Sequence, residues 1–432
     1  TAEMLLPSQR DLIESTFNTK VYNNYGLNDG KSENYGKVSR TDTNTIQDFQ
    51  FLDNTTSHLL KFGADIYINE NNTLSAYTIQ NKSDKTFNGN TLVTTNNIVG
   101  SESPMLVEGE TSSETYNFNY MRNFNKKGHN LEFEGNYSTS KEPEQASYSE
   151  LQNPINLYLN YKDNIKNNKK STLLNLDYTN PISENSKLEL GAEIRADETS
   201  NNRVTTQLDE DYSAFNYDRN IYSGYINYNQ KFYKLSMQLG ARFEQYEVEG
   251  GFEKGIETAK YTDEIFSVYP SAFFTYNISE KNQFQLSYSR RVDRPSIGQV
   301  NPIREWSTPQ ITSVGNPNLK PQFTNSFELN YTRQYDKGSF TFGTFYRRVN
   351  DNITRILNKD PFDENNVEFV SSIPSMDMDA IDYEDMFNTK VDDFGCIKHG
   401  NYPFIGASPD GINVDETNIR FGRMIEIKNI YN

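Results

Sequence analysis

The chain has 432 residues, a formal net charge of −17, a hydrophobic content of 34% and an aromatic content of 13%. This acidity argues against a protein that holds duplex nucleic acid on a basic surface along its whole length. The single cysteine excludes an intrachain disulfide and a cysteine-based zinc site. No apolar run approaches 18 residues, so no transmembrane helix is expected. The chain starts at Thr1 without a leader, which suggests a mature protein or a piece cut from a longer parent.

Low hydrophobicity combined with 29 tyrosines and 27 phenylalanines allows two interpretations. A polar composition can mark disorder, but disordered segments are poor in aromatic residues. The other interpretation is a membrane β-barrel, in which each strand has one face toward lipid and one toward a polar lumen. Strict alternation of apolar and polar residues favours strands over helices. The alternating stretches are 131–137, 188–194, 235–243, 284–288, 327–331 and 340–342.

Six hairpins follow in chain order. Five are closed by short turns rich in Asn, Asp, Gly, Ser or Pro, and the fourth turns near Phe232. The expected strand pairs are 58–69 with 73–86, 113–124 with 130–141, 169–179 with 186–200, 219–231 with 233–248, 266–278 with 283–293, and 324–335 with 339–356. The stretches between hairpins are interpreted as long polar loops, with examples at 87–112, 142–168, 201–218 and 249–265.

Short turns at one end and long loops at the other are typical of an outer-membrane barrel. The expected strands are also longer than the usual ~5–6 residues of a soluble sheet. The fold class is therefore an all-β antiparallel transmembrane barrel meander, incomplete, with about 12–14 strands. A large soluble β-sandwich or propeller is the alternative. Nine apolar residues are expected on the outer face: Leu131, Phe133, Leu188, Leu190, Leu235, Met237, Leu239, Phe284 and Leu286.

Residues 288–321 carry a family resemblance. Arg290, Arg291 and Arg294 precede a loop that ends in Gly315-Asn316-Pro317-Asn318-Leu319-Lys320-Pro321. This stretch resembles the barrel of TonB-dependent outer-membrane receptors, and the similarity covers about 50–370. The resemblance implies uptake of a ligand, a TonB-type energy-coupling partner, outer-membrane lipid around the barrel, and no cofactor. It also places the Gly-Asn-Pro motif where an extracellular loop enters the next strand.

Receptors of this kind have about 22 strands and a plugged lumen. No plug is recognised here and roughly half of the strands are countable, so a partial receptor that does not function alone is expected. No ligand-binding residue can be carried over from the family.

The last residues carry a second resemblance. Ser408-Pro409-Asp410-Gly411, followed by Glu426-Ile427-Lys428, resembles the core of PD-(D/E)XK nucleases of the YqaJ-like phage and viral exonuclease type. The resemblance implies that Asp410 and Glu426 bind Mg²⁺ and that Lys428 orients the attacking water, with DNA as the substrate. Met376 stands where that family has a further acidic residue. An inactive, vestigial α/β fragment is therefore expected.

The expected organisation has three parts. Residues 1–50 form an uncertain segment with a possible strand and loop, residues 51–370 form the barrel fragment, and residues 371–432 form the nuclease-like fragment. A barrel belongs in the bacterial outer membrane and a nuclease belongs with DNA. The hypothesis is therefore a chimera of two gene fragments, with a receptor barrel as the principal function and a Mg²⁺-dependent exonuclease as the alternative.

Overall fold

The protein was analysed as a computed structural model. It describes residues 18–40, 44–152, 157–206, 212–255, 257–303, 305–308, 311–359 and 367–372, together with short strand pieces between 391 and 425. Within this part, no helix is both long enough and apolar enough to cross a membrane.

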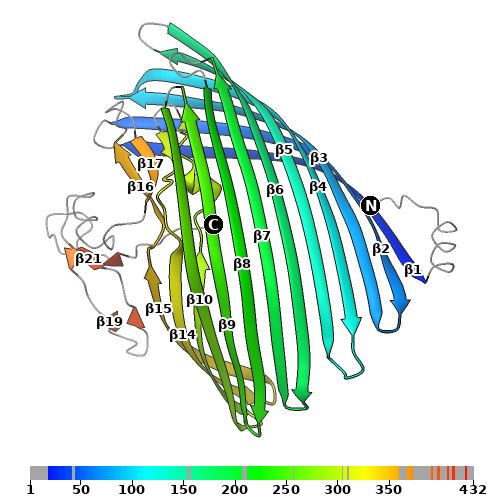
Figure 1. Cartoon of the computed structure of the whole chain (residues 1–432). Coiled ribbons are helices and arrows are strands. Elements are labelled where there is room, and N and C mark those ends of the chain that lie inside the picture. The colour runs from blue at the N-terminus through cyan, green and yellow to red at the C-terminus, as the bar shows by residue number, and fades with distance from the viewer. Residues whose placement is uncertain are drawn as a thin grey trace.

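One antiparallel sheet of thirteen strands dominates the molecule, in the order β1 to β11, then β14 and β15 (Figure 1). Each strand lies beside its neighbour in sequence, which is the expected meander. The strands are β1 Thr19–Arg40, β2 Thr45–Asn69, β3 Asn72–Thr95, β4 Ile98–Asn123, β5 Asn130–Gln152, β6 Leu157–Ser183, β7 Ser186–Thr205, β8 Tyr212–Phe232, β9 Leu235–Lys254, β10 Glu257–Ser279, β11 Asn282–Asp293, β14 Gln322–Tyr335 and β15 Gly338–Asn350. In the described part of the chain β1 and β15 each pair on one side only, so the sheet has two open edges.

The strand register confirms the predicted outer face. Residues directly opposite one another across a ladder lie on the same face of a sheet. Leu190, for example, lies opposite Tyr178 on β6 and Ile226 on β8. Followed from strand to strand, the same pairing places all nine predicted residues on one face of the sheet. Glu132, Glu189 and Gln238 alternate with them and lie on the other face, called the inner face below.

The apolar face forms a band of defined height. On β9 the outward residues from Leu235 to Phe243 are apolar or small, and the next three outward residues are Gln245, Glu247 and Glu249. At ~3.3 Å per residue this apolar stretch is about 26 Å long. A tilted transmembrane strand needs about 9–11 residues, so the stretch from Leu235 to Phe243 fits one membrane crossing.

Tyrosines mark both borders of the apolar band. A row near the short turns consists of Tyr120, Tyr178, Tyr228, Tyr276 and Tyr331. A row at the opposite border includes Tyr137 and Tyr222, both of them exposed. Aromatic girdles at both interfaces are a feature of barrels that sit in membranes.

The structure corrects the predicted strand lengths. Strands β2 to β10 have 20 to 27 residues, and most of the predicted loops belong to strands. The stretch 87–112, for example, is a hairpin closed at Asn96 and Asn97, both of which have positive φ. Two such residues suit the tight turn of a hairpin. The alternation was not visible because these strand ends carry polar residues on both faces.

A smaller sheet follows β11. It contains β12 Glu305–Thr308, β13 Ile311–Val314, β17 Val367–Ser372 and β16 Thr354–Lys359, in that order, so the predicted strand 339–356 divides into β15 and β16. The four-residue helix α2, Ile297–Val300, precedes this sheet. Beyond residue 390 the described elements are the short strands β18 Val391–Asp392, β19 Ile397–Lys398, β20 Gly406–Ala407, β21 Gly411–Asn413 and β22 Met424–Ile425. Residues 373–390, Met376 among them, lie outside the described residues.

Candidate functional site on the inner face

The segment between β11 and β14 folds back onto the inner face. We call residues 294–321, apart from the undescribed 304, 309 and 310, the inward segment. Its buried residues Val300, Ile303 and Leu319 form one apolar cluster with residues of β8 and β9, among them Phe215 and Tyr217. Phe215 and Tyr217 belong to the inner face because they alternate with outward residues of β8. The inward segment therefore covers the ends of β8 and β9 that lie beyond the apolar band.

The Gly-Asn-Pro motif shapes this segment. The Gly315 N–H donates to the carbonyl of Asn301 at 2.8 Å, and the Asn316 N–H donates to the carbonyl of Gln299 at 2.7 Å. A Cβ on Gly315 would lie 2.5 Å from the Asn301 oxygen, so only glycine fits. The Asn316 side chain accepts the N–H of Asn318 at 2.9 Å, a local turn that this residue type favours. Pro321 directly precedes β14, so the motif lies where a loop enters the next strand.

Arg294 anchors the start of the inward segment. It forms an ion pair with Glu244 on β9, and its guanidinium lies 5.2 Å from the centre of the Tyr246 ring. The side chains of Arg294 and Glu244 are only 17% and 5% exposed. Burial lowers the pKa of Arg294 to about 10, and the nearby Arg219, Arg195 and Arg242 contribute to this. Glu244 is thus the counter-charge that stabilises Arg294 close to the other arginines of this region.

Charge pairs continue along the inner face. Arg242 bridges Glu193 at 2.9 Å and Glu244 at 3.2 Å, and it also donates to the Ser223 hydroxyl at 2.7 Å. Most of these side chains are only partly exposed, so their pairing is screened less than it would be at an open surface.

Further along, Asp197 accepts from Arg219 at 2.5 Å and from Ser171 at 2.6 Å. Arg203 and Asp163 pair at 2.8 Å. The polar residues of β6 to β9 therefore form three groups of charge pairs on the inner face.

A cavity of about 230 Å³ lies between the inward segment and the sheet. Its sheet side carries Tyr217, Tyr246, Tyr261 and Asp263, and the inward segment contributes Pro317, Leu319 and Lys320. The hydroxyls of Tyr217 and Tyr246 lie 3.2 Å apart. This cavity combines aromatic surface, hydroxyl groups and two charges of opposite sign in one place.

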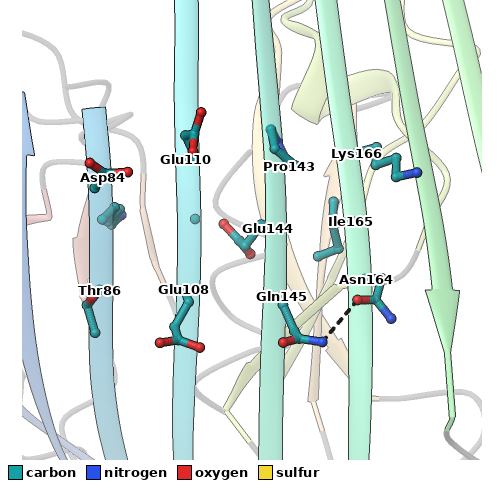
Figure 2. A pocket seen from close by; sticks show the side chains of 12 residues that line it. Asp84, Thr86, Glu108, Glu110, Pro143, Glu144, Gln145, Asn164, Ile165 and Lys166 are labelled. Atoms are coloured by element: carbon teal, nitrogen blue, oxygen red, sulfur yellow. Dashed lines mark hydrogen bonds between the residues drawn. The ribbon is translucent and has the colours of Figure 1, made fainter. Parts of the chain in front are cut away.

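A second concavity crosses β3 to β6 on the outer face, beyond the apolar band. Figure 2 shows Thr86, Glu108, Gln145 and Asn164 in a row on four neighbouring strands, with Gln145 donating to Asn164 at 3.3 Å. It encloses about 460 Å³ and is a shallow trough. Within the described residues no three His, Cys, Asp or Glu side chains are placed to hold a metal ion.

The predicted nuclease residues Asp410, Glu426 and Lys428 lie outside the described residues. Close to them, β21 pairs with β22 and β20 pairs with β19. The Mg²⁺ site and the DNA substrate therefore stay predictions.

The inner-face residues were not identified from the sequence. Tyr217, Tyr246 and Tyr261 lie on three strands, so no linear pattern joins them. The one available signal was Arg294 beside Pro295, within the stretch that carries the family resemblance.

The chain matches the outer membrane protein beta-barrel family over residues 122–373. It belongs to this family. Membership places the protein in the bacterial outer membrane, in agreement with the apolar band and its tyrosine borders.

No curated protein matches the chain. Among solved structures, the ferric-catecholate import receptor Fiu of E. coli K12 is 8% identical, with a TM-score of 0.42, over 81% of this chain and 60% of Fiu. The alcaligin outer-membrane receptor FauA of Bordetella pertussis is 10% identical, with a TM-score of 0.39, over 81% and 55%. FpvA of P. aeruginosa, solved with heterologous pyoverdines, is 10% identical, with a TM-score of 0.48, over 82% and 51%. The chain thus spans half to three-fifths of the length of these proteins.

Proposed function

We propose that the chain is the barrel wall of a TonB-dependent receptor that takes up a ligand from outside the cell. The observation that carries this proposal is the inward segment, which covers the inner face at the strand ends that lie beyond the apolar band. Outer-membrane barrels have their larger connections outside the cell, and here the strands continue well beyond the apolar band on the side of the inward segment, so we assign this side to the exterior. The buried ion pair between Arg294 and Glu244 and the cavity at this position suit a protein that binds a ligand better than an open pore.

The two open edges support the idea that the thirteen strands do not act alone. An unpaired strand edge in lipid leaves backbone groups without partners, and each such group costs several kcal/mol. Either further strands complete the barrel or the edges pair with another chain. The proposed receptor therefore functions as part of a larger barrel.

Gene disruption in the organism that encodes the chain tests the proposal in its natural setting. The mutant and its parent would be supplied with a defined mixture of iron chelates, corrinoids and oligosaccharides, and depletion of each compound would be followed by mass spectrometry. At least one compound should stop disappearing in the mutant. The same compound should stop disappearing in the parent when a protonophore removes the energy supply. An unchanged depletion profile, or uptake that is insensitive to the protonophore, would contradict an energised receptor.

A further inference from the structure

The cavity beneath the inward segment contains a flat aromatic platform. Tyr261 on β10 lies directly opposite Gly250 on β9. A Cβ on Gly250 would lie 2.2 Å from two atoms of the Tyr261 ring, so the ring rests against the bare backbone of the glycine. One face of the Tyr261 ring therefore contacts Gly250, and Tyr261 also lines the cavity.

Polar groups around this platform have unused hydrogen-bonding capacity. The Tyr261 hydroxyl is buried and has no hydrogen-bond partner among the described residues. A buried hydroxyl without a partner is unfavourable, by an amount comparable to a lost hydrogen bond. Asp263, two residues further along the same face, forms no ion pair with a described residue, although its carboxylate accepts the N–H of Glu264 at 3.0 Å. The site thus offers a hydroxyl without a partner among the described residues, and a carboxylate with remaining acceptor capacity, beside an aromatic ring.

The charges around the cavity favour a neutral occupant. Lys320 and Asp263 contribute one charge of each sign to the lining. Arg294, which lies over Tyr246, is already neutralised by Glu244. A cationic ligand would meet Lys320, and an anionic ligand would meet Asp263.

The volume of about 230 Å³ is below the ~300–1,000 Å³ of pockets that enclose a drug-sized ligand. It therefore suits one small ring, or the terminal ring of a longer ligand that continues into the lumen.

We propose that this cavity binds the pyranose ring of a neutral carbohydrate, with the apolar face of the sugar on Tyr261 and its hydroxyl groups bonded to the Tyr261 hydroxyl and Asp263. This assignment rests on the proposed function, because it names the class of ligand that the receptor takes up. Aromatic surface binds the C–H face of the sugar, and the two polar groups fix its orientation, as in other small-ligand sites.

Saturation-transfer NMR on the purified chain in detergent tests the assignment. The probes are the methyl glycosides of glucose, galactose, mannose and xylose, with choline and catechol as a charged and an aromatic comparison. At least one glycoside should receive saturation. Its dissociation constant should rise roughly three- to tenfold in Tyr261→Phe, the effect of one hydrogen bond, and should not change in Tyr276→Phe on the outer face.

Two further measurements separate binding from folding. Tyr261→Phe removes a hydroxyl without a partner, so its thermal unfolding should be unchanged or shifted upward. Gly250→Ala, which displaces the ring, should abolish the saturation signal. Absence of a signal from every glycoside, a signal from choline or catechol alone, or equal affinity in Tyr261→Phe would overturn the proposal. Because this assay needs no energy supply, its failure would leave the gene-disruption test of receptor function standing.

Discussion

The outer apolar band and the inner face beneath the inward segment belong to the same strands, but they differ in what each requires of its side chains. On β9, Met237, Leu239 and Phe243 face outward and need only to be apolar, because lipid provides a uniform surrounding. Glu244 and Tyr246 face inward and depend on individual partners in the inward segment and the neighbouring strands. A substitution on the outer face should therefore act through its hydrophobicity, whereas one on the inner face should act through the group it leaves unpaired.

Glu244→Gln should have the largest effect, because it leaves the buried Arg294 without its counter-charge. Breaking one partner of a buried ion pair costs about 3–5 kcal/mol. The free energy of unfolding, measured by urea titration in lipid vesicles, should fall by an amount in this range. The matched control is Asp336→Asn, which breaks the exposed pair between Lys281 and Asp336 at a short turn. The control should change the free energy of unfolding by less than about 1 kcal/mol. Equal effects for the two variants would show that the buried ion pair stabilises the protein no more than an exposed one.

Leu190→Lys tests the outer band, since it places a charge in the lipid. A lysine at the midplane of a membrane barrel costs about 2–4 kcal/mol. Asn227→Lys should be much milder because Asn227, the residue directly after the cross-strand partner of Leu190, lies on the inner face and points to the lumen. Refolding yield into vesicles, followed by the gel-mobility shift of folded barrels, measures both variants. A milder effect for Leu190→Lys than for Asn227→Lys would reverse the assignment of the faces.

Gly315→Ala probes the inward segment alone. The added methyl group would collide with the backbone of Asn301 and Gln299, and such overpacking costs about 1–3 kcal/mol. Gly298→Ala in α2 is the control, because a Cβ there meets nothing within 4 Å. Proteolysis should cut the inward segment faster in Gly315→Ala than in Gly298→Ala or the natural chain. Equal cleavage rates in all three proteins would show that the motif does not hold the segment.

The smallest expected effect belongs to the C-terminal residues. With Met376 in place of the further acidic residue, we expect no Mg²⁺-dependent digestion of linear duplex DNA by the purified chain. Asp410→Ala should then be indistinguishable from the natural chain. Digestion that requires Mg²⁺ and disappears in Asp410→Ala would establish an active nuclease and displace the expectation of a vestigial fragment.

The sequence by itself determined the meander, the positions of the short turns and the membrane-facing residues. These features are local: alternation with a period of two sets the faces, and turn residues set the register of each hairpin. The lengths of the strands beyond the membrane were not predictable in this way. Residues such as Lys82 and Glu110 have polar surroundings on both faces, and it is cross-strand pairing that holds them in strands.

Only the tertiary structure decided where the inward segment lies and what it encloses. The distance in sequence between Arg294 and Glu244, or between Leu319 and Tyr217, gives no indication of contact. These contacts arise because the segment that leaves β11 folds back onto the inner face of β8 to β10, at the strand ends beyond the apolar band. The buried Arg294 therefore meets its counter-charge Glu244 only after the segment that leaves β11 has folded back onto β9, whereas the contact of the Tyr261 ring with Gly250 already follows from the pairing of β9 with β10.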